Sequence, residues 1–72
     1  MGMEVLCYYD TGKNRKREFL RFQVSRDGEQ YVYQETLCKS FGEETACEEV
    51  DRQEFESEKE ARTVYENRLR DL

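Results

Sequence analysis

Hydrophobic and polar residues alternate over residues 18–25 of the chain. Leu20, Phe22 and Val24 fall on one side of an extended segment, and the other side is polar apart from Phe19. A period of two is typical of a strand with one buried face, because successive side chains point to opposite faces of a sheet. The pattern therefore predicts a half-buried β-strand.

The dipeptide Asp27-Gly28 follows this strand and is a strong signal for a hairpin with a two-residue turn. Both central positions of a type I′ turn need positive φ, which Asp tolerates and Gly prefers. A turn at these two residues predicts a second strand over Gln30–Leu37, with Val24 directly opposite Tyr31.

Two further segments are predicted to complete the sheet. Met3–Tyr9 is rich in β-formers and is followed by turn residues at 10–14. A loop centred on Gly42 then leads to a fourth strand over Ala46–Phe55, although the carboxylates of that segment are poor strand formers. These elements together indicate an antiparallel meander.

The C-terminal segment has helical spacing. Ser57 and Glu60 match a capping box, in which each side chain accepts a hydrogen bond from the first turn of a helix. The predicted helix runs from about Glu58 to Arg70. Its apolar stripe consists of Ala61, Val64, Tyr65, Leu69 and Leu72.

The predicted fold class is α+β: a four-stranded antiparallel β-meander with one C-terminal helix packed on one face, in a single small domain over residues 1–72. The five Tyr and four Phe residues argue for a packed core even though 40% of the residues are charged. The predicted core consists of Leu20, Phe22, Val24, Tyr31, Tyr33, Val64, Tyr65 and Leu69.

Composition argues against an enzyme. A chain of 72 residues has little room for a deep substrate cavity, and it has no His, the commonest general base and metal ligand. We expect no catalytic residue, no cofactor and no metal. An alternative enzyme with Cys7 or Cys38 as nucleophile rests only on the neighbouring Lys39, which could lower a thiol pKa.

The longest uncharged run is Val5–Tyr9, far shorter than the roughly 20 apolar residues of a membrane span. We therefore expect a cytoplasmic protein, in which Cys7, Cys38 and Cys47 remain thiols. Cys38 and Cys47 could face each other across a loop, which makes a disulfide geometrically allowed.

Acidic residues concentrate between Glu43 and Glu60, where nine of eighteen residues are carboxylates. Such clustering favours a basic partner, or else a solvated strand edge that resists aggregation. The predicted protein-binding residues are Glu43, Glu44, Glu48, Glu49, Asp51, Glu54 and Glu56.

Basic residues concentrate at the opposite pole, in the loop over residues 13–17. Such a loop can contact phosphates, although the sequence pI of about 4.8 lies far below that of most nucleic-acid binders. The candidate nucleic-acid-binding residues are Lys13, Arg15, Lys16, Arg17 and Arg21. We also expect Tyr8, Phe19 and Val32 to form a small exposed apolar patch on the sheet face opposite the helix.

From about Arg17 to Leu72 the order of elements resembles the WGR domain, a small module of antiparallel strands and a helix found in some poly(ADP-ribose) polymerases and as free-standing bacterial proteins. The resemblance rests on a strand, an Asp-Gly turn, a strand, a Gly-containing loop, a strand, and then Phe55-Glu56-Ser57 with Glu60-Ala61 and Tyr65-Glu66. At the name-giving motif this chain reads Cys38-Lys39-Ser40-Phe41-Gly42, so only Phe41 and Gly42 match. The family's nucleic-acid contacts are therefore not carried onto Cys38 or Ser40.

These observations predict a small non-enzymatic acidic binding protein whose partner is a protein with a basic surface. In size and charge the chain resembles phage-encoded inhibitors of host defence, such as anti-CRISPR proteins, which implies inhibition of nucleic-acid-binding machinery. The alternative is a degenerate WGR-like nucleic-acid-binding or accessory domain that uses the basic residues between 13 and 21.

Overall fold

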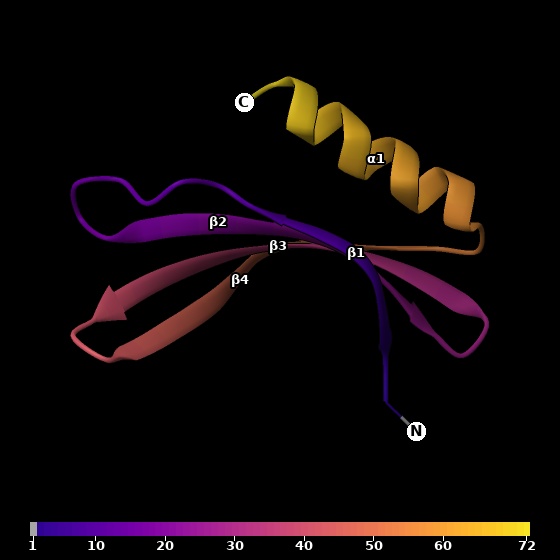
Figure 1. Ribbon diagram of the computed structural model, residues 1–72. Coiled ribbons are helices and arrows are strands. Elements are labelled where there is room, and N and C mark those ends of the chain that lie inside the picture. Colours follow the sequence, from indigo (N-terminus) through magenta and orange to yellow (C-terminus); the bar gives the residue numbers. More distant parts are fainter. Residues whose placement is uncertain (1) are drawn as a thin grey trace.

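The computed structural model describes residues 2–72 and shows one sheet with one helix lying across it (Figure 1). The elements are β1 (Glu4–Asp10), β2 (Glu18–Asp27), β3 (Gln30–Phe41), β4 (Glu44–Phe55) and α1 (Glu58–Arg70). All neighbouring strands are antiparallel and lie in chain order, so β1 and β4 are the two edges of the sheet. The predicted meander and C-terminal helix are confirmed.

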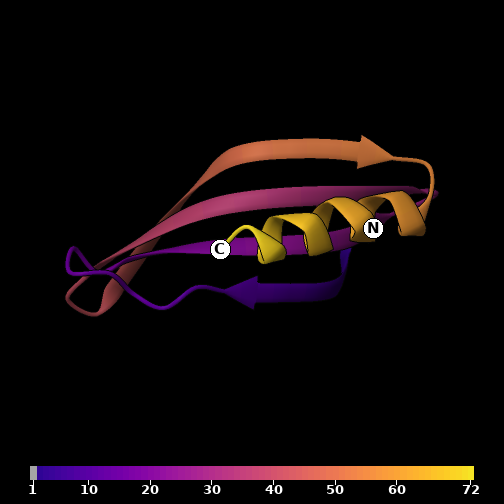
Figure 2. The same cartoon turned by 90° about the horizontal axis from the view of Figure 1, so that it is seen from above.

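The helix covers one face of the sheet, which we call the helix face, and lies over the central strands when seen from above (Figure 2). Phe22, Val24, Tyr33 and Ala61 are buried there and form the core. Half-buried residues surround them: Leu6, Cys7, Leu20, Tyr31, Phe55, Val64, Tyr65 and Leu69. Every residue of the predicted core belongs to this core or to the residues that surround it. The period of two places the strand residues on the helix face, and the helical period places the helix residues on the side that faces the sheet.

The other face of the sheet, which we call the open face, has no helix over it (Figure 1). Tyr8 is 60% exposed there, as expected of the predicted apolar patch, but Val32 is fully buried. Val32 lies on a central strand, paired with Ser25 on one side and Glu54 on the other. Neighbouring side chains therefore cover this small residue, and its predicted exposure was wrong.

The turn between β2 and β3 lies one residue later than predicted. Asp27 pairs with Gln30, so the two turn residues are Gly28 and Glu29, and Gly28 has φ of 63°. Positive φ at the first central position suits a glycine, whereas Asp27 stays in the extended strand. The register consequently shifts by two residues, and Val24 faces Tyr33 rather than Tyr31. A shift of two keeps each side chain on its predicted face.

The strands on either side of Gly42 are longer than predicted. Phe41 pairs with Glu44, so the expected loop is a two-residue turn of Gly42 and Glu43, with φ of 62° at Gly42. The tight turn lets β3 continue to Phe41 and lets β4 begin at Glu44. Glutamate is a poor strand former, but β3 pairs with β4 along its length and provides backbone hydrogen-bond partners for these residues.

A bulge in β1 separates two neighbouring apolar residues. The register changes between Val5, which pairs with Ser25, and Cys7, which pairs with Val24. Cys7 therefore packs against the core, while Val5 is 51% exposed. Strict alternation over Met3–Tyr9 predicts that Val5 and Cys7 share the apolar face of the first strand. That prediction is wrong, because the extra residue at the bulge changes the alternation.

The helix begins where the sequence predicts, but not through the predicted side-chain cap. Ser57 occupies the N-cap position, and its backbone carbonyl accepts a hydrogen bond from the N–H of Ala61 at 3.3 Å. Its hydroxyl makes no capping hydrogen bond. The acidic residues Glu58 and Glu60 in the first turn instead favour the positive end of the helix dipole.

Candidate functional site

Strand β4 carries most of the predicted acidic site along a free edge of the sheet. By register, Glu44, Glu48 and Asp51 belong to the helix face, whereas Glu49 and Glu54 belong to the open face. Glu43 lies in the preceding turn and Glu56 follows the strand. All of these carboxylates are exposed except Asp51, which is half-buried. The structure therefore places them along one edge rather than on one face.

Four of these carboxylates have no polar partner among residues 2–72: Glu56 after β4, and three nearer to the β3–β4 turn. Glu43, Glu44 and Glu48 take part in no ion pair and in no side-chain hydrogen bond within the described part of the chain. A carboxylate in this state is fully available to a cation on another molecule. These three residues, which we call the acidic tip, lie in the β3–β4 turn and in the first half of β4.

Two other carboxylates of β4 are partly neutralised by Arg52. Glu54 lies 3.2 Å from the Arg52 guanidinium, and Glu49 lies 3.9 Å from it. Glu49 also accepts a hydrogen bond from the Gln34 side chain at 2.8 Å. These contacts are exposed, so each contributes little to stability, but they reduce the negative charge along this part of the edge.

Asp51 belongs to a different set of contacts. Its carboxylate lies 3.8 Å from the Arg68 guanidinium of α1 and accepts a hydrogen bond from Gln53 at 3.3 Å. Arg68 also lies 3.3 Å from Glu35, which accepts a hydrogen bond from the Tyr33 hydroxyl. Asp51 thus helps to attach the helix to the sheet, and the structure separates it from the acidic tip.

The basic loop between β1 and β2 is ordered by Asn14. Its side-chain oxygen accepts hydrogen bonds from the backbone N–H groups of Lys16, at 2.9 Å, and Glu18, at 3.0 Å. The backbone carbonyl of Arg17 accepts a hydrogen bond from Ser40 at 3.0 Å, which joins the loop to β3. The four cations of the loop are all exposed, and none forms an ion pair within residues 2–72: Lys13, Arg15, Lys16 and Arg17.

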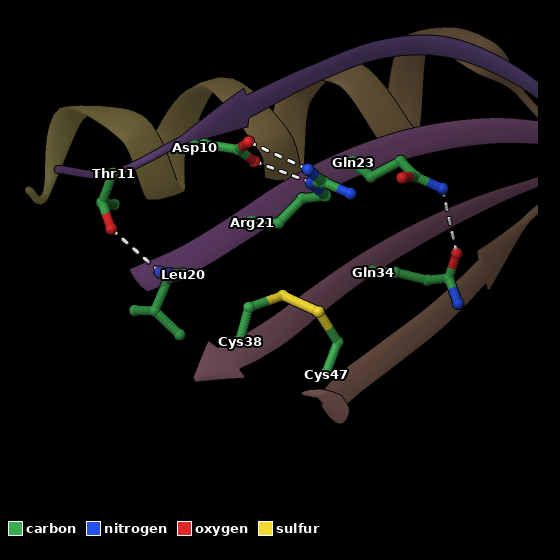
Figure 3. Close-up of polar contacts among 8 residues, drawn as sticks. All are labelled: Asp10, Thr11, Leu20, Arg21, Gln23, Gln34, Cys38 and Cys47. Atoms are coloured by element: carbon green, nitrogen blue, oxygen red, sulfur yellow. Dashed lines mark hydrogen bonds and ion pairs between the residues drawn. A yellow bond between two sulfur atoms is a disulfide. The ribbon is translucent and has the colours of Figure 1, made fainter. Parts of the chain in front are cut away.

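Arg21 lies apart from the loop and is already paired. Its guanidinium donates to both carboxylate oxygens of Asp10, at 2.7 and 2.9 Å (Figure 3). It also lies 5.3 Å from the centre of the Tyr8 ring. The hydrogen bond from Arg21 lowers the pKa of Asp10 below its ordinary value, and burial opposes the shift only in part. The structure therefore does not bring Arg21 together with the other candidate nucleic-acid-binding residues.

Cys38 and Cys47 form a disulfide between β3 and β4 (Figure 3). The prediction that all three cysteines remain thiols was wrong for this pair. The two-residue turn at Gly42 fixes the register and places the two cysteines directly opposite each other. A two-residue turn at Gly42 and Glu43, read from the sequence, would have predicted that Cys38 lies opposite Cys47. Cys7 is the free cysteine of the chain.

Cys7 lies between β1 and the helix, next to Arg62 and Tyr65. Its sulfur lies 3.7 Å from the Arg62 guanidinium on the helix face, and Arg62 also donates to Glu58 at 2.8 Å. Burial is the main cause of the raised pKa of the nearby Tyr65. No group of three potential metal ligands occurs among residues 2–72, and no helix of that range is long and apolar enough to cross a membrane.

Comparison with known proteins gives no relative. No family model, no curated protein and no solved structure matches the chain. The resemblances to the WGR domain and to phage-encoded inhibitors therefore stay predictions.

Proposed function

We propose that this chain is a small non-enzymatic binding protein that uses the carboxylates along β4 to engage a basic surface of another protein. The observation that carries the proposal is the acidic tip. Glu43, Glu44 and Glu48 are exposed and have no partner within residues 2–72. A cation on another molecule can therefore pair with them without displacing a partner within residues 2–72.

The mechanism is electrostatic competition. Carboxylates spaced along an extended strand can contact Lys and Arg side chains that otherwise hold phosphates, and long-range attraction increases the association rate. A chain with a formal charge of −5 is repelled as a whole by nucleic acid, but its carboxylates can occupy a protein surface that binds nucleic acid. The proposed biological role is inhibition of a nucleic-acid-binding protein.

A capture experiment tests this proposal. The tagged chain is incubated with a nuclease-treated lysate, and bound proteins are identified by mass spectrometry. The test variant replaces Glu43, Glu44 and Glu48 with Lys. The control replaces Glu29, Glu66 and Asp71 with Lys, which changes the net charge equally at exposed positions that form no ion pair and no side-chain hydrogen bond within residues 2–72.

We expect a partner with a basic surface to be retained by the wild type and the control, and to be lost from the acidic-tip variant. Equal loss from both variants would show that only net charge matters, and the proposed site would then be wrong. Retention by both variants would also contradict the proposal, because the contact would not involve the acidic tip.

The ordered basic loop supports a second candidate function, nucleic-acid binding. The exposed ring of Phe41, at 62%, follows Ser40, which is joined to Arg17 by a backbone hydrogen bond. Cations beside an exposed aromatic ring are typical of surfaces that bind single strands. Both tips lie at the same end of the sheet, so the carboxylates of the acidic tip oppose this function (Figure 1).

Fluorescence polarisation with a labelled single-stranded oligonucleotide tests this second candidate. Binding at low salt that disappears near physiological salt, and that is lost when Lys13, Arg15 and Lys16 are replaced by Glu, would support it. Absence of binding at low salt would exclude it.

A further inference from the structure

The backbone of β4 has a free edge, and the register shows which residues present it. Cys38 and Cys47 are directly opposite, with their Cα atoms only 4.0 Å apart. In an antiparallel ladder the closely spaced pairs are the ones that do not exchange backbone hydrogen bonds. The backbone groups of Cys47 therefore point away from β3, toward the free edge.

A second observation gives the same assignment. The N–H of Ser40 donates to the carbonyl of Arg17 at 3.0 Å, so the backbone of Ser40 points away from β4. Ser40 pairs with Thr45. Thr45 and Cys47 thus belong to the non-hydrogen-bonded set, and Glu49, opposite Thr36, continues it.

The usable edge ends at a bulge. Thr36 pairs with Glu49 and Glu35 pairs with Asp51, so Val50 is the extra residue. A bulge bends a strand and interrupts the ladder. The regular part of the edge is therefore the segment over residues 44–49, which offers the outward backbone groups of Thr45, Cys47 and Glu49.

Side chains of this segment select what can pair with it. Glu44, Glu48 and Glu49 are exposed, and residues 44–49 include no cation. A second copy of β4 would bring the same carboxylates beside these, and like charges oppose such pairing. A strand rich in Lys and Arg would instead find an opposite charge on both faces of the sheet, since Glu48 and Glu49 point to different faces.

We propose that the partner binds by adding an extended basic segment to residues 44–49 as a fifth strand of the sheet. This inference rests on the proposed function, because it takes the acidic edge as the binding site. Backbone hydrogen bonds to Thr45, Cys47 and Glu49 supply the strand register, and the carboxylates supply the preference for basic side chains.

The probe is an eight-residue peptide in which two lysines and two threonines alternate as pairs, so that lysines fall on both faces of an added strand. Two further peptides carry N-methyl groups on alternate backbone nitrogens, in opposite phases. They keep every charge, but a methylated nitrogen that faces β4 cannot donate a hydrogen bond. Strand addition therefore requires that at least one of the two loses binding to the wild-type chain, whereas a purely electrostatic contact treats all three alike.

The protein variant is Thr45→Pro, with Thr45→Val as the matched control. Proline removes the outward backbone N–H and is tolerated on an edge strand. Valine keeps the backbone N–H, and its side chain is similar in shape to that of threonine. We expect Thr45→Pro to weaken the unmethylated peptide about fivefold, as for one lost hydrogen bond, and Thr45→Val to leave affinity unchanged. A preserved Cys38–Cys47 disulfide and an unchanged circular dichroism spectrum verify that the proline variant is folded.

The outcomes separate this inference from the proposed function. Equal binding of all three peptides, with loss on replacing Glu43, Glu44 and Glu48 by Lys, would leave the acidic site standing and overturn strand addition. No binding of the unmethylated peptide would also overturn it. Self-association of the wild type that disappears in Thr45→Pro would assign the edge to a second copy and overturn the basic occupant. If the acidic-tip variant still captures the partner from the lysate, that result contradicts the proposed function and not the backbone pairing measured with the peptides.

Discussion

The hydroxyl of Tyr33 donates a hydrogen bond of 2.6 Å to the carboxylate of Glu35, two residues further along β3. The same carboxylate oxygen lies 3.3 Å from the Arg68 guanidinium of α1. Tyr33 is fully buried and the Glu35 side chain is 14% exposed, so this contact lies beneath the helix. One carboxylate thus connects a core tyrosine to the last turn of the helix.

Replacing Tyr33 with Phe should lower the free energy of unfolding by about 1 to 3 kcal/mol, because a hydrogen bond to a charged, largely buried acceptor is lost while the ring still fills the core. Urea unfolding at neutral pH measures the change. An unaltered midpoint would show that the hydroxyl contributes nothing to the attachment of the helix.

Tyr33→Phe should also change how the chain titrates and how its stability depends on pH in alkaline solution. Burial, and then the hydrogen bond to Glu35, raises the pKa of Tyr33 far above its ordinary value of 10.0. The unfolded chain therefore ionises this residue first, and stability is lost as pH rises above about 10. In absorbance of tyrosinate, the residue that titrates last in the wild type should be missing from Tyr33→Phe.

Reduction of the Cys38–Cys47 disulfide should destabilise the chain. The two residues are separated by 9 positions, and the loss of loop-closure entropy for a loop of this size corresponds to about 2.5 kcal/mol. Urea unfolding with and without a phosphine reductant measures the difference. The intact mass should also rise by about 2 Da on reduction. A mass unchanged by reductant would show that the disulfide is absent in solution.

Acid should remove the contribution of the Asp10–Arg21 pair. Because Arg21 lowers the pKa of Asp10 below 3.8, the unfolded chain binds this proton first as pH falls. The stabilisation is present above the unfolded pKa and is lost as pH falls through the lower folded value. Asp10→Asn should therefore be less stable than wild type near pH 7, and the gap should narrow as pH falls below 3.8. A gap that stays constant with pH would assign it to packing rather than charge.

Replacing Ser57 with Ala should change stability by only a few tenths of a kcal/mol, against about 1 kcal/mol for a serine whose hydroxyl caps a helix. The reason is that the Ser57 hydroxyl makes no capping hydrogen bond. As a contrast, Ala61→Leu should cost about 1 to 3 kcal/mol, since Ala61 is fully buried against the sheet. Thermal unfolding of both variants measures the changes, and a larger loss in Ser57→Ala than in Ala61→Leu would contradict this account of the helix.

Hydrophobic periodicity in the sequence was enough to predict the order of the elements, the helix from Glu58 to Arg70 and the core around Phe22. Periodicity predicts the face of the sheet on which a side chain lies. A register error of two residues does not change that face, so the predicted core residues were correct although the predicted turn at Asp27 was misplaced. The bulge at Leu6 was not predictable in this way, because a bulge changes the alternation without any marker in composition.

The candidate site was predictable only in part. The exposure of Glu43, Glu44 and Glu48 follows from their polarity, but the roles of Asp51 and Arg21 depend on partners far along the chain: Arg68 for the first and Asp10 for the second. Charge counting cannot distinguish a free carboxylate from one that is already paired. Likewise, the pairing of Cys38 with Cys47 depends on where the Gly42 turn begins.

The association rate between the chain and its captured partner, measured over a range of salt concentrations, tests whether the acidic edge of β4 is the binding site. We expect replacement of Glu43, Glu44 and Glu48 with Lys to slow association and to remove most of its salt dependence, while the equal charge change at Glu29, Glu66 and Asp71 alters both far less. If instead the acidic-tip variant associates at the wild-type rate, and replacing Lys13, Arg15 and Lys16 with Glu abolishes association, the acidic edge of β4 is not the binding site.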